Sequence, residues 1–412
     1  MKVLLVNSYY YPEMVGGTEY FVKRLAEALV STGNSVSVLC LGNGNSVETI
    51  NGVKVFRYKP ALGRYVDFAN ERMLIRNMIC KLVNRIYNPF DLSKLFHILE
   101  TIKPDVVHSN GLMDISASLW QICKKLNISI LHTYHDYNFL CPRGTLISKR
   151  TNEICTGPNL LCRLYRCYNR ELSRRIDIVT APSNFVLSAF QKERYLPVNN
   201  GYVVSNAINI DMDYTECLIE RRSEKIMDKD YLTFVFLGQL GAHKGIKWLL
   251  DSFAEVNNSK IVLRIAGKGK LSGLVSEFTK KDSRIIYEGY LSETQVAELL
   301  KECDVLIAPS IWEEPFGLIV IEAYKYGLPV IATNRGAFPE IVINEKTGTI
   351  IDAGSLSSLR DCIVRYSDDR RIVHGMLTNI ASHLKSFSLD EQTSKYIELY
   401  KYLLSKELPG RC

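Results

Sequence analysis

The sequence predicts an α/β protein built of two doubly wound domains in series. Short apolar runs alternate with longer segments of helical periodicity, which is the pattern of parallel strands joined by crossover helices. The alternation starts at Val3–Val6 and restarts at Leu232–Leu237, after a charged and weakly apolar stretch from Asp211 to Asp230. The chain has 412 residues, of which 47% are apolar, and this is enough for two domains with cores of their own.

The first half opens with a strand at Val3–Val6 and a helix at Glu19–Val30, where apolar residues recur at helical spacing. Gly33 and its polar neighbours then end the helix. The later apolar runs that we expect to be strands are Val36–Leu41, Val53–Tyr58, Val106–His108, Ile128–His132, Ile178–Ala181 and Tyr202–Val204. The first domain therefore covers residues 1–207.

The second half repeats the alternation without a close repeat of the sequence. After the strand at Leu232–Leu237, a helix is expected at Ile246–Phe253. The further strands expected in this half are Ile261–Ala266, Ile285–Tyr287, Val305–Ala308 and Val330–Ala332. This domain covers residues 208–389, and a last helical pattern runs from Asp390 to Lys406.

The charge is unevenly distributed along the chain. Residues 1–200 carry 25 Lys and Arg against 15 Asp and Glu, whereas the remainder carries 26 against 29. A basic first half indicates an anionic partner, which could be a phosphate-bearing acceptor, a membrane surface or a nucleic acid. Because no recognised nucleic-acid motif accompanies the charge, we expect no nucleic-acid partner.

Two basic helical stretches contribute to this charge. They suit an anionic membrane surface, and they equally suit a solvated face over a core-facing apolar stripe. Their basic residues are Arg64, Arg72, Arg76, Lys81 and Arg85 in one stretch, and Arg163, Arg166, Arg170, Arg174 and Arg175 in the other.

The sequence contains no membrane-spanning or export segment that we recognise. No apolar run approaches the ~18 residues that a membrane helix needs. Residues 1–7 are too short and too soon polar for a signal peptide. We therefore expect a cytoplasmic protein, with the inner face of the membrane as the place of any peripheral contact.

Most of the eleven cysteines fall into two groups. Those that lie singly in apolar stretches are interpreted as small core residues, namely Cys40, Cys80, Cys123, Cys303 and Cys362. Another four lie within 27 residues, namely Cys141, Cys155, Cys162 and Cys167. Four thiols could hold a structural zinc ion, but their spacings of 14, 7 and 5 differ from those of common zinc sites. Zinc, redox-labile thiols and unpaired thiols all stay open.

The strongest chemical signal is the stretch from Pro309 to Ala323, which follows a strand, turns at Pro315–Gly317 and enters a helix. Backbone N–H groups at such a turn can bind a diphosphate. Glu314 and Glu322 are eight residues apart, so one carboxylate can lie at the site and the other can accept ribose hydroxyls from within the helix. The alternative is an ordinary helix start, at which the glutamates interact favourably with the helix dipole.

This stretch resembles the Glu-x7-Glu signature of retaining GT-B glycosyltransferases of the GT4 family. The stretches at Tyr326–Ala332 and Gly336–Val342 look like the next blocks of that family, and the resemblance covers nearly the whole chain. It implies two Rossmann-like domains that face a central cleft. The acceptor would bind to residues 1–207 and the nucleotide-sugar to residues 208–389, and residues 390–412 would pack back on the first domain.

The resemblance also implies roles for single residues. Glu314 would lie near the transferred sugar and Glu322 on the ribose. The backbone of Phe316, Gly317 and Leu318 would meet the phosphates and the sugar.

A second block runs from Phe236 to Gly245, where a strand enters a glycine-containing loop. Lys244 in this loop can neutralise a leaving diphosphate as it gains charge. The block is similar to the family's Gly-Arg…Lys-Gly block, in which Lys244 matches the lysine. Gln239 stands in place of the arginine, so one cation is missing: either the diphosphate is stabilised less strongly, or His243 or another cation compensates.

Two further groups lie in the first half. Gly16 and Gly17 permit close backbone approach between a strand and a helix, as in a plain tight turn, and they resemble the family's glycine-rich loop facing the donor phosphate. His135 follows a strand and matches the histidine that often contacts the transferred sugar in this family, with His132 as its competitor. His108 ends another strand and is expected to line the acceptor pocket.

We therefore expect a retaining glycosyltransferase that uses a UDP- or GDP-sugar and no required metal or other cofactor. The acceptor would be a glycan or a polyprenyl-phosphate-linked precursor, in the biosynthesis of cell-surface polysaccharide. Two alternatives remain open. A nucleotide-sugar 2-epimerase would share the architecture, and Gln239 keeps open a catalytically inactive partner of another transferase.

Overall fold

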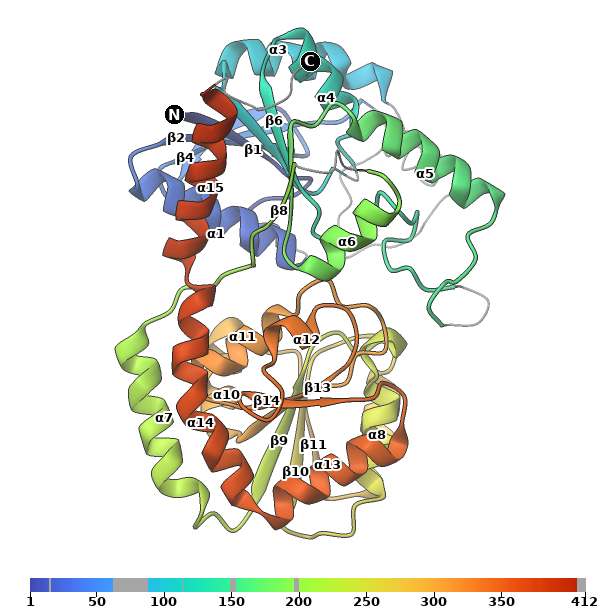
Figure 1. Cartoon of the computed structure of the whole chain (residues 1–412), viewed down its shortest axis with the longest axis vertical. Helices are drawn as coiled ribbons and strands as arrows, with labels where there is room; N and C mark the ends of the chain where they lie inside the picture. Colours follow the sequence, from blue (N-terminus) through green and yellow to red (C-terminus); the bar gives the residue numbers. More distant parts are fainter. Residues whose placement is uncertain (15, 62–87, 113, 149–152, 196–199, 406–412) are drawn as a thin grey trace. The chain divides into compact units, whose positions relative to one another are not determined.

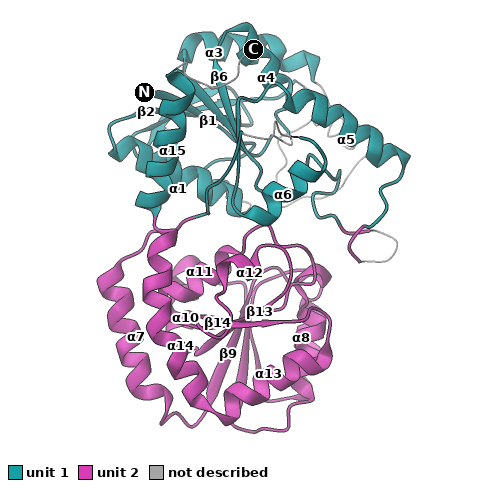
Figure 2. Cartoon of the chain, in the orientation of Figure 1, with its two compact units in different colours: residues 1–146, 156–206, 389–412 teal, residues 147–155, 207–388 magenta. Residues whose placement is uncertain are grey.

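The computed structural model divides the chain into two compact units (Figures 1 and 2). Unit 1 comprises residues 1–146, 156–206 and 389–412, and unit 2 comprises residues 147–155 and 207–388. The structure describes all residues except 15, 62–87, 113, 149–152, 196–199 and 406–412. The basic stretch from Arg64 to Arg85 therefore lies outside the described residues, and so does Cys80.

Unit 1 contains one sheet with helices on it. Its strands are β1 (Lys2–Val6), β2 (Ser35–Leu41), β3 (Ser46–Ile50), β4 (Val53–Tyr58), β5 (Val106–Ser109), β6 (Ser129–Thr133), β7 (Ile178–Ala181) and β8 (Gly201–Val203). Its helices are α1 (Gly17–Ser31), η1 (Pro89–Asp91), α3 (Leu92–Ile102), α4 (Ser118–Lys125), α5 (Leu160–Ser173), α6 (Asn184–Lys192) and α15 (Leu389–Leu404).

The sheet of unit 1 has the strand order β3-β4-β2-β1-β5-β6-β7-β8. Among the described strands, β3 is the one that pairs antiparallel, with β4, and the others pair in parallel. Helices α1 and α15 lie side by side on it (Figure 1), and Tyr396 and Tyr400 of α15 are fully buried against Leu25 of α1 and its neighbours. Burial of each such side chain contributes about 1.5–3 kcal/mol, which fixes the C-terminal helix to this unit.

Unit 2 repeats the architecture. Its strands are β9 (Leu232–Leu237), β10 (Ile261–Ala266), β11 (Ile285–Gly289), β12 (Val305–Ala308), β13 (Val330–Thr333) and β14 (Gly348–Ile351). Its helices are α7 (Met212–Ile226), η2 (Ala242–Lys244), α8 (Ile246–Ala254), α9 (Ser272–Lys281), α10 (Glu293–Glu302), α11 (Leu318–Lys325), α12 (Phe338–Ile341), α13 (Leu356–Asp368), α14 (Arg370–Leu384) and η3 (Lys385–Phe387).

The sheet of unit 2 is parallel throughout its described strands, in the order β11-β10-β9-β12-β13-β14. All residues of β12 and β13 are buried, as expected for central strands covered on both faces. The chain order reverses between β9 and β12, which are neighbours. Such a switch point is where α/β sheets of this kind bind ligands, at the carboxyl ends of the strands.

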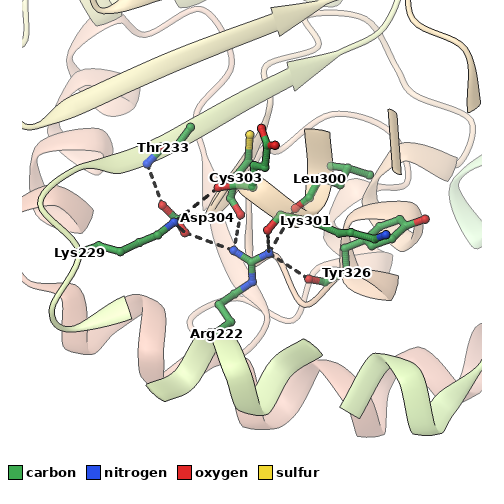
Figure 3. A network of polar contacts seen from close by, with 9 residues as sticks. Arg222, Lys229, Thr233, Leu300, Lys301, Cys303, Asp304 and Tyr326 are labelled. Atoms are coloured by element: carbon green, nitrogen blue, oxygen red, sulfur yellow. Dashed lines mark hydrogen bonds and ion pairs between the residues drawn. The ribbon is translucent and has the colours of Figure 1, made fainter. Parts of the chain in front are cut away.

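A buried ionic network lies at the amino ends of strands β9 and β12, opposite the carboxyl ends where ligands bind (Figure 3). Asp304 is fully buried and accepts hydrogen bonds from Arg222 (3.2 Å), Lys229 (2.6 Å) and the backbone N–H of Thr233 (2.9 Å). The Arg222 guanidinium also donates to the carbonyl groups of Leu300, Lys301, Cys303 and Tyr326. This network ties α7 to the loops that precede β12 and β13.

The predicted strands agree with the observed ones to within one or two residues at each end, but two strands are missing from the prediction. The missed strands are β3 and β14. Of the structure's helices, judged over the described residues, none is long and apolar enough to cross a membrane.

Candidate active site

The site in unit 2 lies where β9 and β12 end side by side. The loop after β9 carries Lys244 and the loop after β12 carries Glu314, and the model brings their charged groups together. Lys244 Nζ lies 2.8 Å from Glu314 Oε2 and 3.1 Å from Oε1. Two residues that were 70 positions apart in the sequence therefore form an ion pair at the switch point of the sheet.

Further donors hold the Glu314 carboxylate. Its Oε2 accepts hydrogen bonds from Ser310 Oγ (3.1 Å) and Trp312 Nε1 (2.8 Å). Lys244 Nζ also lies 5.2 Å from the centre of the Trp312 ring, within the range of a cation–π contact. Because Glu314 is 8% exposed and is surrounded by donors, the carboxylate is fixed in place before any ligand arrives.

The loop after β13 packs directly on the backbone of Glu314. A Cβ at Gly336 would lie 2.1 Å from Glu314 O and 2.3 Å from Glu314 N, and the φ of Gly336 is +58°, so a side chain is excluded there. The neighbouring Ala337 N–H donates to Glu314 O (2.8 Å), and Gly336 N–H donates to Glu313 Oε2 (2.7 Å). Three loops thus position one carboxylate.

Helix α11 starts at this edge without a side-chain cap. Its N-cap residue is Gly317, with a φ of +105°, and a Cβ there would lie 2.5 Å from the Phe338 ring. The first N–H groups of a helix have no acceptor within the helix, and at an uncapped start they are available to an anion. Glu322 follows in the second turn of α11, half-buried, while the Phe316 side chain is buried in the core.

Gln239, which stands in place of the arginine of the family pattern, is exposed in the loop after β9. His243 does not supply that charge. Burial, with the nearby Lys244 ammonium, lowers the pKa of His243, so the imidazole is neutral at neutral pH. Another cation, Lys268, lies in the loop after β10. Its Nζ is 4.4 Å from the centre of the exposed Tyr290 ring.

In unit 1, the glycine-rich turn leads into α1 at the end of β1. The Gly16 N–H donates to Glu19 Oε2 (2.7 Å), and Glu19 Oε1 accepts from Asn7 Nδ2 (3.2 Å). Asn7 in turn accepts the Gly111 N–H (2.8 Å). The buried Glu19 therefore ties Gly16 and Gly17, at the start of α1, to the ends of β1 and β5.

His135 packs against Phe21 of α1, with 4.4 Å between the ring centres, and its tautomer follows from its hydrogen bond with Asn110. Asn110 donates its Nδ2 to the carbonyl of His108 (3.2 Å), so its Oδ1 faces His135 and accepts from Nε2–H (2.9 Å). This leaves Nδ1 of His135 as an acceptor. Burial lowers the pKa of His135 to about 3, so the ring is neutral and suits a hydroxyl group better than a phosphate.

The expectation that His108 lines an acceptor pocket is wrong. His108 is fully buried, and both ring nitrogens are occupied: Nδ1 by Tyr400 OH (2.7 Å) and Nε2 by Thr133 Oγ1 (2.7 Å). Burial holds its pKa well below the usual range. His108 therefore fastens α15 to the sheet. His132 is also buried, with Nδ1 on Ser109 Oγ (2.9 Å).

The four clustered cysteines do not gather into a zinc site. Cys141, Cys155, Cys162 and Cys167 are all described, and the described residues contain no group of three or more His, Cys, Asp or Glu placed to hold a metal ion. The single cysteines within the described part are core residues as expected, namely Cys40, Cys123, Cys303 and Cys362.

Two family models match successive parts of the chain. Residues 219–381 match the model of "Glycosyl transferases group 1", and residues 15–212 match that of "Glycosyltransferase Family 4". A lipopolysaccharide core biosynthesis mannosyltransferase of Rhizobium meliloti is 33% identical over 258 residues, which are 59% of this chain and 70% of the relative. The chain belongs to the group 1 glycosyl transferases. It is a glycosyltransferase, as the sequence predicted.

Other relatives extend this match. An uncharacterised 42.6 kDa protein in the cps region of Klebsiella pneumoniae is 26% identical over 97% of this chain and 100% of the relative. A UDP-Gal:α-D-GlcNAc-diphosphoundecaprenol α-1,3-galactosyltransferase of Escherichia coli is 22% identical over 78% of this chain and 81% of the relative. The sucrose-phosphate synthase of Thermosynechococcus elongatus superposes with a TM-score of 0.74 at 19% identity, over 98% of this chain and 99% of that one. The fold of the glycosyltransferase is therefore GT-B.

The sequence alone did not identify several residues that shape the two groups. Ser310 and Trp312 lie inside the recognised stretch, but only the structure shows that both donate to Glu314. Asn110 directly follows β5, and a polar residue at a strand's carboxyl end could have signalled it.

Proposed function

We propose that this glycosyltransferase moves a sugar from a UDP- or GDP-sugar to a glycan or polyprenyl-phosphate-linked acceptor, with retention of the anomeric configuration. The observation that carries the proposal is the Lys244–Glu314 ion pair, which lies at the switch point of unit 2 beside the uncapped start of α11. On this account unit 2 holds the nucleotide-sugar and unit 1 the acceptor.

The charges at this edge suit the breaking of a bond between a sugar and a diphosphate. The sugar gains positive charge and the leaving diphosphate gains negative charge. Lys244 and the first N–H groups of α11, at Leu318 and the next residue, would stabilise the diphosphate. Glu314, held by its donors, would face the side on which positive charge develops.

Three further groups have proposed roles in binding. Glu322 would accept the ribose hydroxyls from within α11. The neutral His135 would accept a hydrogen bond from a hydroxyl of the transferred sugar through Nδ1. Gly16 and Gly17 would let the donor phosphate approach the start of α1. No metal or other cofactor is assigned to these steps.

The nature of the acceptor is inferred from the relatives and the charge. One relative is named for lipopolysaccharide core biosynthesis, and another for galactosyl transfer to a diphosphoundecaprenol-linked GlcNAc. The first 200 residues carry the excess of positive charge, which suits a phosphate-bearing lipid carrier. We therefore place the reaction in cell-surface polysaccharide synthesis, with the protein on the cytoplasmic face of the membrane.

A donor-turnover assay tests the proposal. Purified protein is incubated with UDP- and GDP-sugars, with and without a membrane-lipid extract, and the released nucleotide and the anomeric proton of the product are followed by NMR. We expect release from one nucleotide class, stimulation by the lipid extract, and a product with the donor's anomeric configuration. Conversion of a lone nucleotide-sugar to its 2-epimer without an acceptor would contradict transfer, and an inverted product would contradict retention.

A further inference from the structure

Helix α5 carries three of its four leucines on the outside. Leu160, Leu161 and Leu164 are 72%, 75% and 58% exposed, whereas the buried residues of the helix are Asn169, Leu172 and Ser173. A helix on the surface of a water-soluble domain normally turns its leucines inward. The exposed leucines occupy the first turn and a half, so they form one apolar tip.

The inner face of α5 buries Leu172 and is otherwise anchored by polar groups. Tyr165 OH donates to Asn138 O (2.7 Å), and Arg166 Nε donates to Leu140 O (2.8 Å). Asn169 Nδ2 donates to Phe139 O (3.2 Å). These bonds fix which side of the helix faces the protein, so the leucines cannot turn inward without breaking them.

The exposed face is also basic. Arg166 is used internally, because its guanidinium lies 2.5 Å from Glu193 and is mostly buried. The remaining cations of the helix and its C-terminal end are Arg163, Arg170, Arg174 and Arg175, against Glu171. An apolar edge combined with an excess of arginines matches the two signals that together hold a protein on an anionic bilayer.

We propose that the outer face of α5, with Leu160, Leu161 and Leu164 inserted and the arginines on the headgroups, docks the glycosyltransferase on an anionic lipid bilayer. The charge selects this occupant: Glu171 pairs with Arg174 (3.0 Å), and a neutral apolar partner would gain nothing from the arginines that remain in excess. The inner anchors run to residues 138–140, a few positions after His135, so the docked face is joined directly to the loop of the unit 1 site. The proposal rests on the proposed function only for the need to reach a lipid-linked acceptor.

Vesicle co-sedimentation of the full chain, without donor or acceptor, tests this surface. Wild type is expected to bind phosphatidylglycerol-containing vesicles, to lose binding at high salt, and to ignore pure phosphatidylcholine. L160S/L161S/L164S should lower the partition coefficient at least tenfold. R163Q/R174Q should lower it by about fivefold for each arginine and weaken the salt dependence.

Matched controls use exposed residues elsewhere. Val47→Ser with Leu356→Ser replaces side chains that are 56% and 41% exposed, and Lys247→Gln with Arg371→Gln replaces exposed cations. These variants should bind vesicles as wild type does, and all variants should keep the wild-type Tm and nucleotide binding.

Failure of wild type to bind anionic vesicles, or wild-type binding by the leucine variant, would overturn the proposal. Loss of a concentration-dependent dimer in the leucine variant, without any lipid binding, would overturn it in favour of a protein interface. Neither result depends on donor turnover, so failure of the proposed function is recognised separately.

Discussion

Lys244→Ala is expected to lower kcat for sugar transfer by about 100- to 1000-fold, the cost of removing one preorganised group that meets developing charge. The ammonium lies at the switch point, between the Glu314 carboxylate and the Trp312 ring. In the proposed mechanism the ammonium stabilises the diphosphate most strongly as it leaves. The substitution should therefore lower kcat more than it lowers the affinity for the unreacted donor. Steady-state kinetics and donor binding, measured on the same preparation, separate the two effects.

The control for this substitution is Lys247→Ala, three residues further on. Lys247 pairs with Asp251 on the surface of α8, and its side chain is 67% exposed, so the variant should keep wild-type kcat. A second variant, Glu314→Gln, keeps the shape of the carboxylate but removes its charge, and should also reduce kcat. Equal activity of Lys244→Ala and Lys247→Ala would remove Lys244 from the chemistry.

Asp304→Ala is expected to lower the free energy of unfolding of unit 2 by about 3–5 kcal/mol. The substitution leaves the buried Arg222 with its carbonyl acceptors but without a carboxylate, and it also removes the acceptor of the Thr233 N–H (Figure 3). Burial lowers the pKa of Arg222, which shows that its charge already carries a cost there. Denaturant unfolding followed by circular dichroism measures the change.

Asp251→Ala provides the comparison for an exposed ion pair. Its partner Lys247 is largely exposed, so the loss should stay below about 1 kcal/mol. If Asp304→Ala were no more destabilising than Asp251→Ala, the network of Figure 3 would contribute nothing beyond a surface pair. A double variant, Asp304→Leu with Arg222→Met, removes both charges together and should recover part of the loss.

The sequence predicted most of the fold because buried parallel strands are continuous apolar runs. The strand β3 was missed because it is exposed along nearly its whole length and therefore has no apolar signal. The strand β14 was missed because it is four residues long and only its last two, Ile350 and Ile351, are apolar. The pairing of Lys244 with Glu314 could be anticipated, because two loops that leave neighbouring strands must meet at the same edge.

Contacts between distant segments could not be read from the chain. His108 was misinterpreted because its partner Tyr400 lies 292 residues later, on a helix that packs back on the first sheet. The zinc hypothesis for the four cysteines depended on their closeness in the sequence, which does not fix the positions of thiols along a loop. The arginines of α5 were visible in the sequence, but only the structure shows that Arg166 turns inward while the leucines face outward.

The most direct test of the donor site is a calorimetric titration of the folded protein with UDP and with GDP. The account predicts that one of the two binds. Glu322→Ala should weaken that binding at least tenfold through loss of the ribose hydrogen bonds, whereas Glu220→Ala on the exposed side of α7 should not. A folded wild-type protein that binds neither nucleotide would contradict a nucleotide-sugar site at the ends of β9 and β12.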